Sequence, residues 1–145
     1  MSPAPTPLLA FDSLLFGRVE RGKIERGQPH HTLILTANFS MQRIAVNANL
    51  QRFGAASLLD VSDPARDQTV GAKWITDLGV TYALCRRWQV GANVSNLFDV
   101  YPDEWRDYEL GVAGVLSMNG VFRYPGGISP FGMNGRTAYV RVTYR

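Results

Sequence analysis

The chain has 145 residues, of which 46% are hydrophobic and 19% charged, and its formal net charge is +3. This length is enough for one domain with a core, and the balance of apolar and charged residues excludes wholesale disorder. Lysine and arginine are scattered along the sequence, so no nucleic-acid partner is expected. The only cysteine, Cys85, excludes an intrachain disulfide and lacks the surroundings typical of a catalytic thiol.

The first 30 residues (1–30) are expected to form an extended leader and a loop that enters the first strand. Small residues and prolines alternate over residues 1–7, and residues 18–28 are rich in charge and glycine, as loops are. Residues 8–19 are predicted to form a short helix or turn. We expect no signal peptide in this chain, because no basic segment precedes a long apolar run. No stretch reaches the roughly 18 apolar residues that a membrane-spanning helix requires.

Residues 31–145 contain five segments in which apolar and polar residues alternate with period two, as they do in strands with one apolar face. The segments lie near residues 32–40, 44–52, 72–84, 88–95 and 136–145. Tight turns join the first segment to the second and the third to the fourth. The other two connections are long and run from about 55 to 69 and from about 97 to 135, where we expect two extracellular loops. Long strands with alternating short turns and long loops are typical of outer-membrane barrels.

Each segment has one apolar and one polar face, and two interpretations follow. The apolar face packs on a soluble core, or it faces lipid while the polar face lines a hydrated lumen. The length of the strands and the aromatic residues near both of their ends favour the second interpretation, in which the apolar face contacts lipid. We therefore predict an all-β fold, an antiparallel meander of about five long strands that forms part of a transmembrane β-barrel. The residues expected to face lipid on the last two strands are Trp88, Val90, Ala92, Val94, Val140, Val142 and Tyr144.

Candidate binding residues are few, and no catalytic arrangement is present. Trp105, Tyr108 and Tyr124 lie in the longest connection, where aromatic rings can contact a ligand at the mouth of a barrel or pack within the loop. Adjacent His30 and His31 would point to opposite faces of a strand and so cannot share a metal ion. The acidic residues between 99 and 109 lack the spacing of a calcium loop. We expect no metal, no cofactor and no enzyme activity.

The segment Asn96-Leu97-Phe98-Asp99 is expected to end the fourth strand. The Asn96 and Asp99 side chains would cap a turn there, with Leu97 and Phe98 packed at the rim. This segment, followed by Tyr101-Pro102, resembles a sequence near the end of TonB-dependent outer-membrane receptors. Residues 135–145 resemble the closing strand of these receptors. Shorter matches lie at residues 19–29, 51–54 and 105–108.

The resemblance covers the chain from about residue 15 onward. It implies a receptor in the cell outer membrane that takes up a siderophore, cobalamin or carbohydrate, with a plug inside a barrel of about 22 strands and energy supplied by TonB. Five strands cannot close such a barrel, because an open edge leaves unpaired backbone groups in lipid. We therefore interpret the chain as a carboxy-terminal fragment that is inactive alone. It stops at Arg145, whereas the family usually ends on one further aromatic residue.

The expected partners are outer-membrane lipid, the missing remainder of the barrel and plug, and TonB through the full-length parent. Two alternatives remain open from the sequence. One is a soluble carbohydrate-binding β-sandwich that uses Trp105, Tyr108 and Tyr124. The other is a small complete barrel formed by several copies of this chain.

Overall fold

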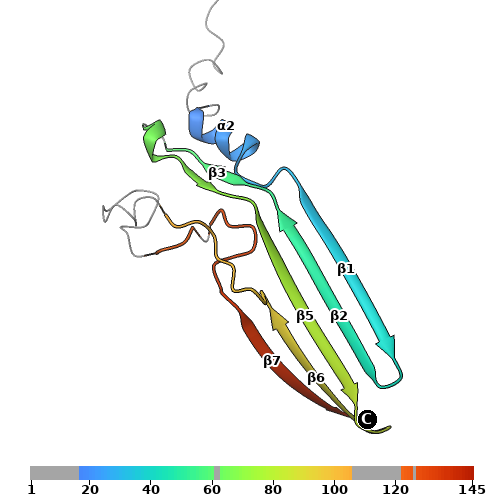
Figure 1. Ribbon diagram of the computed structural model, residues 1–145. Helices are drawn as coiled ribbons and strands as arrows, with labels where there is room; N and C mark the ends of the chain where they lie inside the picture. Colours follow the sequence, from blue (N-terminus) through green and yellow to red (C-terminus); the bar gives the residue numbers. More distant parts are fainter. Residues whose placement is uncertain (1–16, 61–62, 106–121, 126) are drawn as a thin grey trace, which may run out of the picture.

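The computed structural model describes residues 17–60, 63–105, 122–125 and 127–145. A five-stranded antiparallel sheet with strand order β1-β2-β5-β6-β7 dominates it (Figure 1). No helix in these ranges is long and apolar enough to cross a membrane. The bounds are close to those predicted: β1 (Thr32–Met41), β2 (Ile44–Phe53), β5 (Lys73–Ala83), β6 (Trp88–Ser95) and β7 (Thr137–Tyr144).

The register places most of the apolar residues of the five strands on one side of the sheet, which we call the apolar face. Because successive side chains point to opposite sides, a slip of one residue between any two strands would break this face. The agreement of four separate registers therefore makes the face continuous. Opposed pairs on it include Leu35–Leu50, Phe39–Val46, Val46–Val80, Val80–Ala92, Ala92–Val140 and Val90–Val142.

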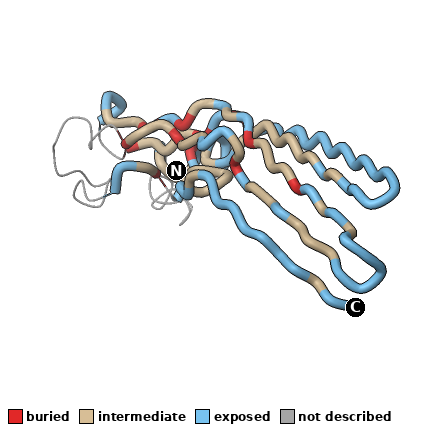
Figure 2. The backbone as a smooth tube through the Cα atoms, turned by 60° about the horizontal axis from the view of Figure 1, so that its bottom comes forward, coloured by how far each residue is buried: buried red, intermediate tan, exposed pale blue. Residues whose placement is uncertain are grey.

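Most of the sheet is exposed, and the buried residues gather towards the end that carries the long connections (Figure 2). Val140 is 71% exposed and Val142 59% exposed, although both are apolar. A β-sandwich would cover such a face with a second sheet, whereas the strands of the described residues form one layer with a small separate ribbon. The sandwich alternative is therefore not supported.

A short helix and a two-stranded ribbon lie beyond the upper end of β1 and β2 (Figure 1). The helix is α2 (Arg18–Glu25), and the ribbon pairs β3 (Ala56–Leu58) with β4 (Gln68–Val70). Between β3 and β4 lies the 3₁₀ turn η2 (Pro64–Arg66). The prediction of a loop over residues 18–28 was wrong for α2, and the first long connection is more ordered than predicted.

Contacts with the ribbon explain why α2 forms in a charge-rich segment. Gly22 is buried, and a Cβ atom there would lie 2.5 Å from Cδ1 of Leu59. The Ser57 amide donates a hydrogen bond of 2.7 Å to the Arg26 carbonyl. Such long-range contacts stabilise a short helix that is marginal alone.

Candidate functional site

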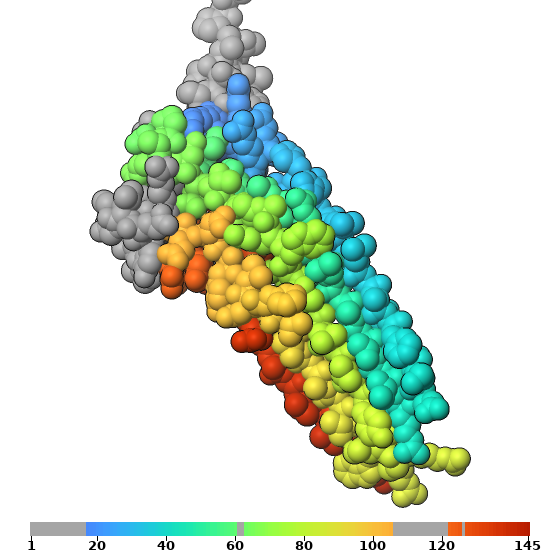
Figure 3. Space-filling view, viewed as in Figure 1, coloured from blue at the N-terminus to red at the C-terminus, as the bar shows by residue number. Residues whose placement is uncertain are grey.

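The long connections meet at one end of the sheet, which we call the loop end (residues 54–60, 63–72, 96–105, 122–125 and 127–136). At the opposite end lie the tight β1–β2 and β5–β6 turns and the end of β7, which we call the short-turn end. Figure 3 shows the green and orange segments of the loop end packed together at the top of the sheet. The Gln68 side chain joins them by donating a hydrogen bond of 3.0 Å to the Glu104 carbonyl.

Asn96 organises the turn that follows β6. It has a left-handed backbone (φ 52°) and is 6% exposed. Its Nδ2 donates to the Val100 carbonyl at 2.8 Å, and its Oδ1 accepts from the Val100 amide at 2.9 Å. The Asn96 amide donates to Asp77 Oδ1 at 2.9 Å. The predicted capping role of Asn96 is confirmed.

Asp99 connects this turn to the start of β7. Its backbone is also left-handed (φ 57°), and its Oδ1 accepts a hydrogen bond of 2.7 Å from the Arg136 amide. The negative charge of Asp99, together with desolvation and a hydrogen bond to Asp99, raises the pKa of Tyr101 above its ordinary value. The Tyr101 ring stacks on Tyr124, with centroids 5.1 Å apart. These contacts hold the beginning and the end of the second long connection together.

Gly135 lies so close to this cluster that a larger residue does not fit. A Cβ atom there would lie 2.0 Å from the Tyr101 hydroxyl and 2.5 Å from Asp99 Oδ1. We expect Gly135→Ala to lower the free energy of unfolding by about 1–3 kcal/mol, the usual cost of overpacking. Urea titration checks this. Gly127→Ala is the matched control, since nothing lies within 4 Å of a Cβ atom there, and equal effects of the two changes would contradict the prediction.

Asp103 ties the second long connection to the start of β5. Its Oδ1 accepts from Lys73 Nζ at 2.6 Å and its Oδ2 from the Gly71 amide at 2.6 Å. Partial burial acts to raise the pKa of Asp103. The hydrogen bonds from Lys73 and Gly71 and the Lys73 charge outweigh it, so the pKa lies below its ordinary value.

Acid is therefore expected to loosen the loop end. Because the folded pKa of Asp103 is lowered, its contribution to stability is present above the unfolded pKa of about 4 and is lost as the pH falls through the folded value. Limited proteolysis between pH 5 and pH 2.5 should show faster cleavage of the loop end at the acid limit. Asp103→Asn should weaken this pH dependence, whereas Glu25→Gln at the end of α2 should not. An unchanged acid response in Asp103→Asn would exclude this carboxylate as the cause.

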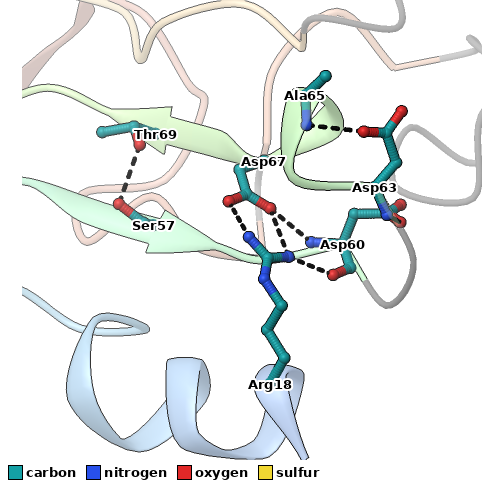
Figure 4. Close-up of polar contacts among 7 residues, drawn as sticks. All are labelled: Arg18, Ser57, Asp60, Asp63, Ala65, Asp67 and Thr69. Carbon is teal, nitrogen blue, oxygen red and sulfur yellow. Dashed lines mark hydrogen bonds and ion pairs between the residues drawn. The ribbon is translucent and has the colours of Figure 1, made fainter.

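A second ion pair fixes α2 to the ribbon, as Figure 4 shows. The Arg18 guanidinium contacts both carboxylate oxygens of Asp67 and donates to the Asp60 carbonyl at 2.5 Å. The Asp60 amide donates to Asp67 Oδ1 at 2.9 Å, and the hydrogen bond from Arg18 lowers the pKa of Asp67. Every described member of this cluster has a protein partner. We therefore assign the cluster a structural role, which is to hold α2 against the first long connection, rather than a role in ligand binding.

The three aromatic residues predicted to contact a ligand have different positions. Trp105 is only 7% exposed, and its amide donates to the Arg123 carbonyl at 2.9 Å. Tyr124 is half-buried between the Tyr101 ring and the Arg123 guanidinium, which lies 5.5 Å from its centroid. Tyr108 lies outside the described residues. The burial of Trp105 favours packing over ligand contact.

Phe98 differs from its predicted position. The sequence predicted packing at the rim, but Phe98 is 70% exposed, so the described residues cover little of it. Metal sites are also absent from the described ranges, where no group of three or more His, Cys, Asp or Glu side chains is placed to hold an ion.

The polar face of the sheet carries a hollow of about 200 Å³ lined in part by Asn38, Asn47, Gly79 and Asn93. Asn47 Nδ2 donates to Asn38 Oδ1 at 2.5 Å. A Cβ atom at Gly79 would lie 2.5 Å from Asn93 Oδ1, so glycine makes room for the amide. The alternation in residues 32–40, 44–52 and 88–95 places these amides on the polar face, but the sequence has no signal for the hollow itself.

No protein-family model and no curated protein sequence matches the chain. Solved structures of the ferric enterobactin receptor from Pseudomonas aeruginosa do match it. A double mutant of that receptor aligns with a TM-score of 0.56 at 21% identity, and a single mutant in complex with enterobactin aligns with 0.57 at 21%. The chain has the fold of one section of that receptor. Each match covers 81% of this chain and 16% of the receptor chain.

The fold predicted from the sequence, an all-β antiparallel meander of long strands like those of a β-barrel receptor, is thereby confirmed. The resemblance to TonB-dependent receptors is confirmed at the level of the fold. The similar structures are those of a receptor.

Proposed function

We propose that the chain forms the carboxy-terminal barrel section of a TonB-dependent receptor in the outer membrane. One observation carries the proposal: a single-layer sheet with a continuous, exposed apolar face has the fold of a section of a known receptor. In this arrangement the apolar face contacts lipid through Trp88, Val90, Ala92, Val94, Val140, Val142 and Tyr144. The polar face lines the lumen, and the loop end lies outside the cell.

The activity belongs to the assembled receptor in this proposal. Strands β1 and β7 each have one unpaired edge in the described sheet, and unpaired backbone groups are costly in lipid. We infer that the rest of the barrel and its plug pair with these edges, that TonB acts on the full-length parent, and that the chain alone is inactive.

A siderophore is the ligand class that the comparison favours, because the similar receptor carries ferric enterobactin in its name. Tyr124 and Arg123 are the residues of the described loop end that we propose for ligand contact. Cobalamin and carbohydrate receptors are the other outcomes of the uptake test.

The membrane placement is tested by labelling single cysteines in β6. In a Cys85→Ser background, Val90→Cys, Ala92→Cys and Val94→Cys are expected to resist a water-soluble maleimide in lipid vesicles. Gln89→Cys, Asn93→Cys and Ser95→Cys on the polar face are the matched set and should react. Uniform labelling along the strand would contradict lipid contact.

Uptake tests the receptor activity itself. We expect deletion of the codons for this chain in the producing bacterium to abolish uptake of an iron-loaded, radiolabelled siderophore, with labelled cobalamin and maltodextrin unaffected. Loss of one of the other two ligands instead would reassign the ligand class. Unchanged uptake of all three would contradict the receptor proposal.

A further inference from the structure

Charge is distributed unevenly along the sheet. The half that contains the short-turn end comprises residues 38–47, 79–93 and 139–145, and these segments carry no acidic residue. All described acidic residues lie towards the loop end or in α2. The basic residues of this half are Arg43, Arg86, Arg87, Arg141 and Arg145.

Three of these arginines surround a hollow of about 210 Å³ at the short-turn end. Arg86, Arg87 and Arg145 line it, and its other lining residues carry no charge. The hollow is held by the backbone, because the Arg145 amide donates to the Arg87 carbonyl at 2.9 Å. None of the three forms an ion pair with another described residue. No described acidic side chain therefore pairs with these three guanidinium groups.

An exposed aromatic pair lies beside the hollow on the apolar face. Trp88, which also lines the hollow, packs on Tyr144 with ring centroids 5.0 Å apart. The two side chains are 46% and 60% exposed. Exposed aromatic rings at the end of an apolar strand face occupy the headgroup level of a bilayer. Three arginines next to this level can reach a headgroup while their stems stay on apolar surface.

We propose that this hollow binds the phosphate group of an anionic phospholipid through Arg86, Arg87 and Arg145, with Trp88 against the lipid beside it. Guanidinium groups suit this ligand because they bind phosphate oxygens through paired, charge-assisted hydrogen bonds. The inference rests on the proposed function, since a lipid can reach the hollow only if the apolar face lies in a bilayer.

Tryptophan quenching by brominated lipid tests the proposal on the full chain. Trp74→Phe and Trp105→Phe leave Trp88 as the reporter. The chain is reconstituted in phosphatidylcholine vesicles that contain one-fifth phosphatidylglycerol. Two preparations are compared, one with brominated acyl chains on phosphatidylglycerol and one with brominated acyl chains on phosphatidylcholine, and the mole fraction of brominated lipid is the same in both. We expect brominated phosphatidylglycerol to quench Trp88 more strongly, with a local preference on the order of fivefold per arginine. Arg86→Gln/Arg87→Gln should remove most of the preference.

The control variant removes the same charge elsewhere. Arg21→Gln/Arg26→Gln in and after α2 should retain the preference, and circular dichroism of each variant should show unchanged strand content. Equal quenching by both lipids, or a preference that survives Arg86→Gln/Arg87→Gln, would overturn the lipid site and leave the membrane placement standing. A preference abolished by millimolar inorganic phosphate would show a site for the free anion instead. No quenching by either lipid would overturn the proposed function as well.

Discussion

Replacing Ala92 by arginine is expected to destabilise the membrane-inserted sheet by about 2–4 kcal/mol, the cost of an arginine on the lipid face of a barrel near the bilayer centre. Ala92 lies near the middle of β6 and is opposite Val80 on one side and Val140 on the other. A charge there has no polar neighbour in these pairs. Urea titration of the chain in phosphatidylcholine vesicles, followed by tryptophan fluorescence, measures the change.

The control for this prediction lies one residue away. Asn93→Arg places the same side chain on the polar face, opposite Gly79 and Tyr139, where we expect a change of less than 1 kcal/mol because water reaches the guanidinium. The difference between the two variants is the informative quantity. If Asn93→Arg were the more harmful change, the two faces of the sheet would have to be exchanged.

Asn96→Ala is expected to cost about 3 kcal/mol of unfolding free energy. The change removes both side-chain hydrogen bonds to Val100 and leaves that amide and carbonyl without these partners. It also forces alanine into the left-handed backbone at φ 52°. Proteolysis within the loop end should accelerate in parallel, since the turn positions the second long connection.

Asn96→Gly separates the two causes. Glycine adopts a left-handed backbone without strain but makes neither hydrogen bond. We therefore expect Asn96→Gly to fall between the parent chain and Asn96→Ala, with a gap of about 1 kcal/mol to the latter. Identical unfolding curves for Asn96→Ala and the parent would show that the turn forms without this side chain.

The sheet could be predicted from the sequence because its signal is periodic. Alternation in residues 88–95 already assigns each side chain to a face, and the register then opposes Val90 to Val142 as that alternation requires. The capping role of Asn96 could also be predicted from the sequence, because asparagine is among the few residues that favour a left-handed turn. These features depend on local chemistry repeated over several residues.

The parts that sequence reasoning missed depend on distant residues. Helix α2 exists because Gly22 meets Leu59 and Arg18 meets Asp67, and neither partner is signalled within residues 18–25. The burial of Trp105 depends in the same way on a fold that brings Arg123 to it. An aromatic residue in a loop has the same sequence signature whether it packs inside the loop or contacts a ligand.

The direction of the two edge strands has a consequence for any closed assembly. Strands β1 and β7 run the same way, because three antiparallel strands separate them (Figure 1). Joining β7 to β1, within one chain or between copies arranged in a ring, would therefore create a parallel seam. A barrel that is antiparallel throughout needs an odd number of further strands between these edges, so that the total is even, as in bacterial outer-membrane barrels. A ring of identical copies in one orientation keeps a parallel β7–β1 seam at every junction, whatever the total number of strands, whereas a larger chain that inserts an odd set of antiparallel strands between these edges has none.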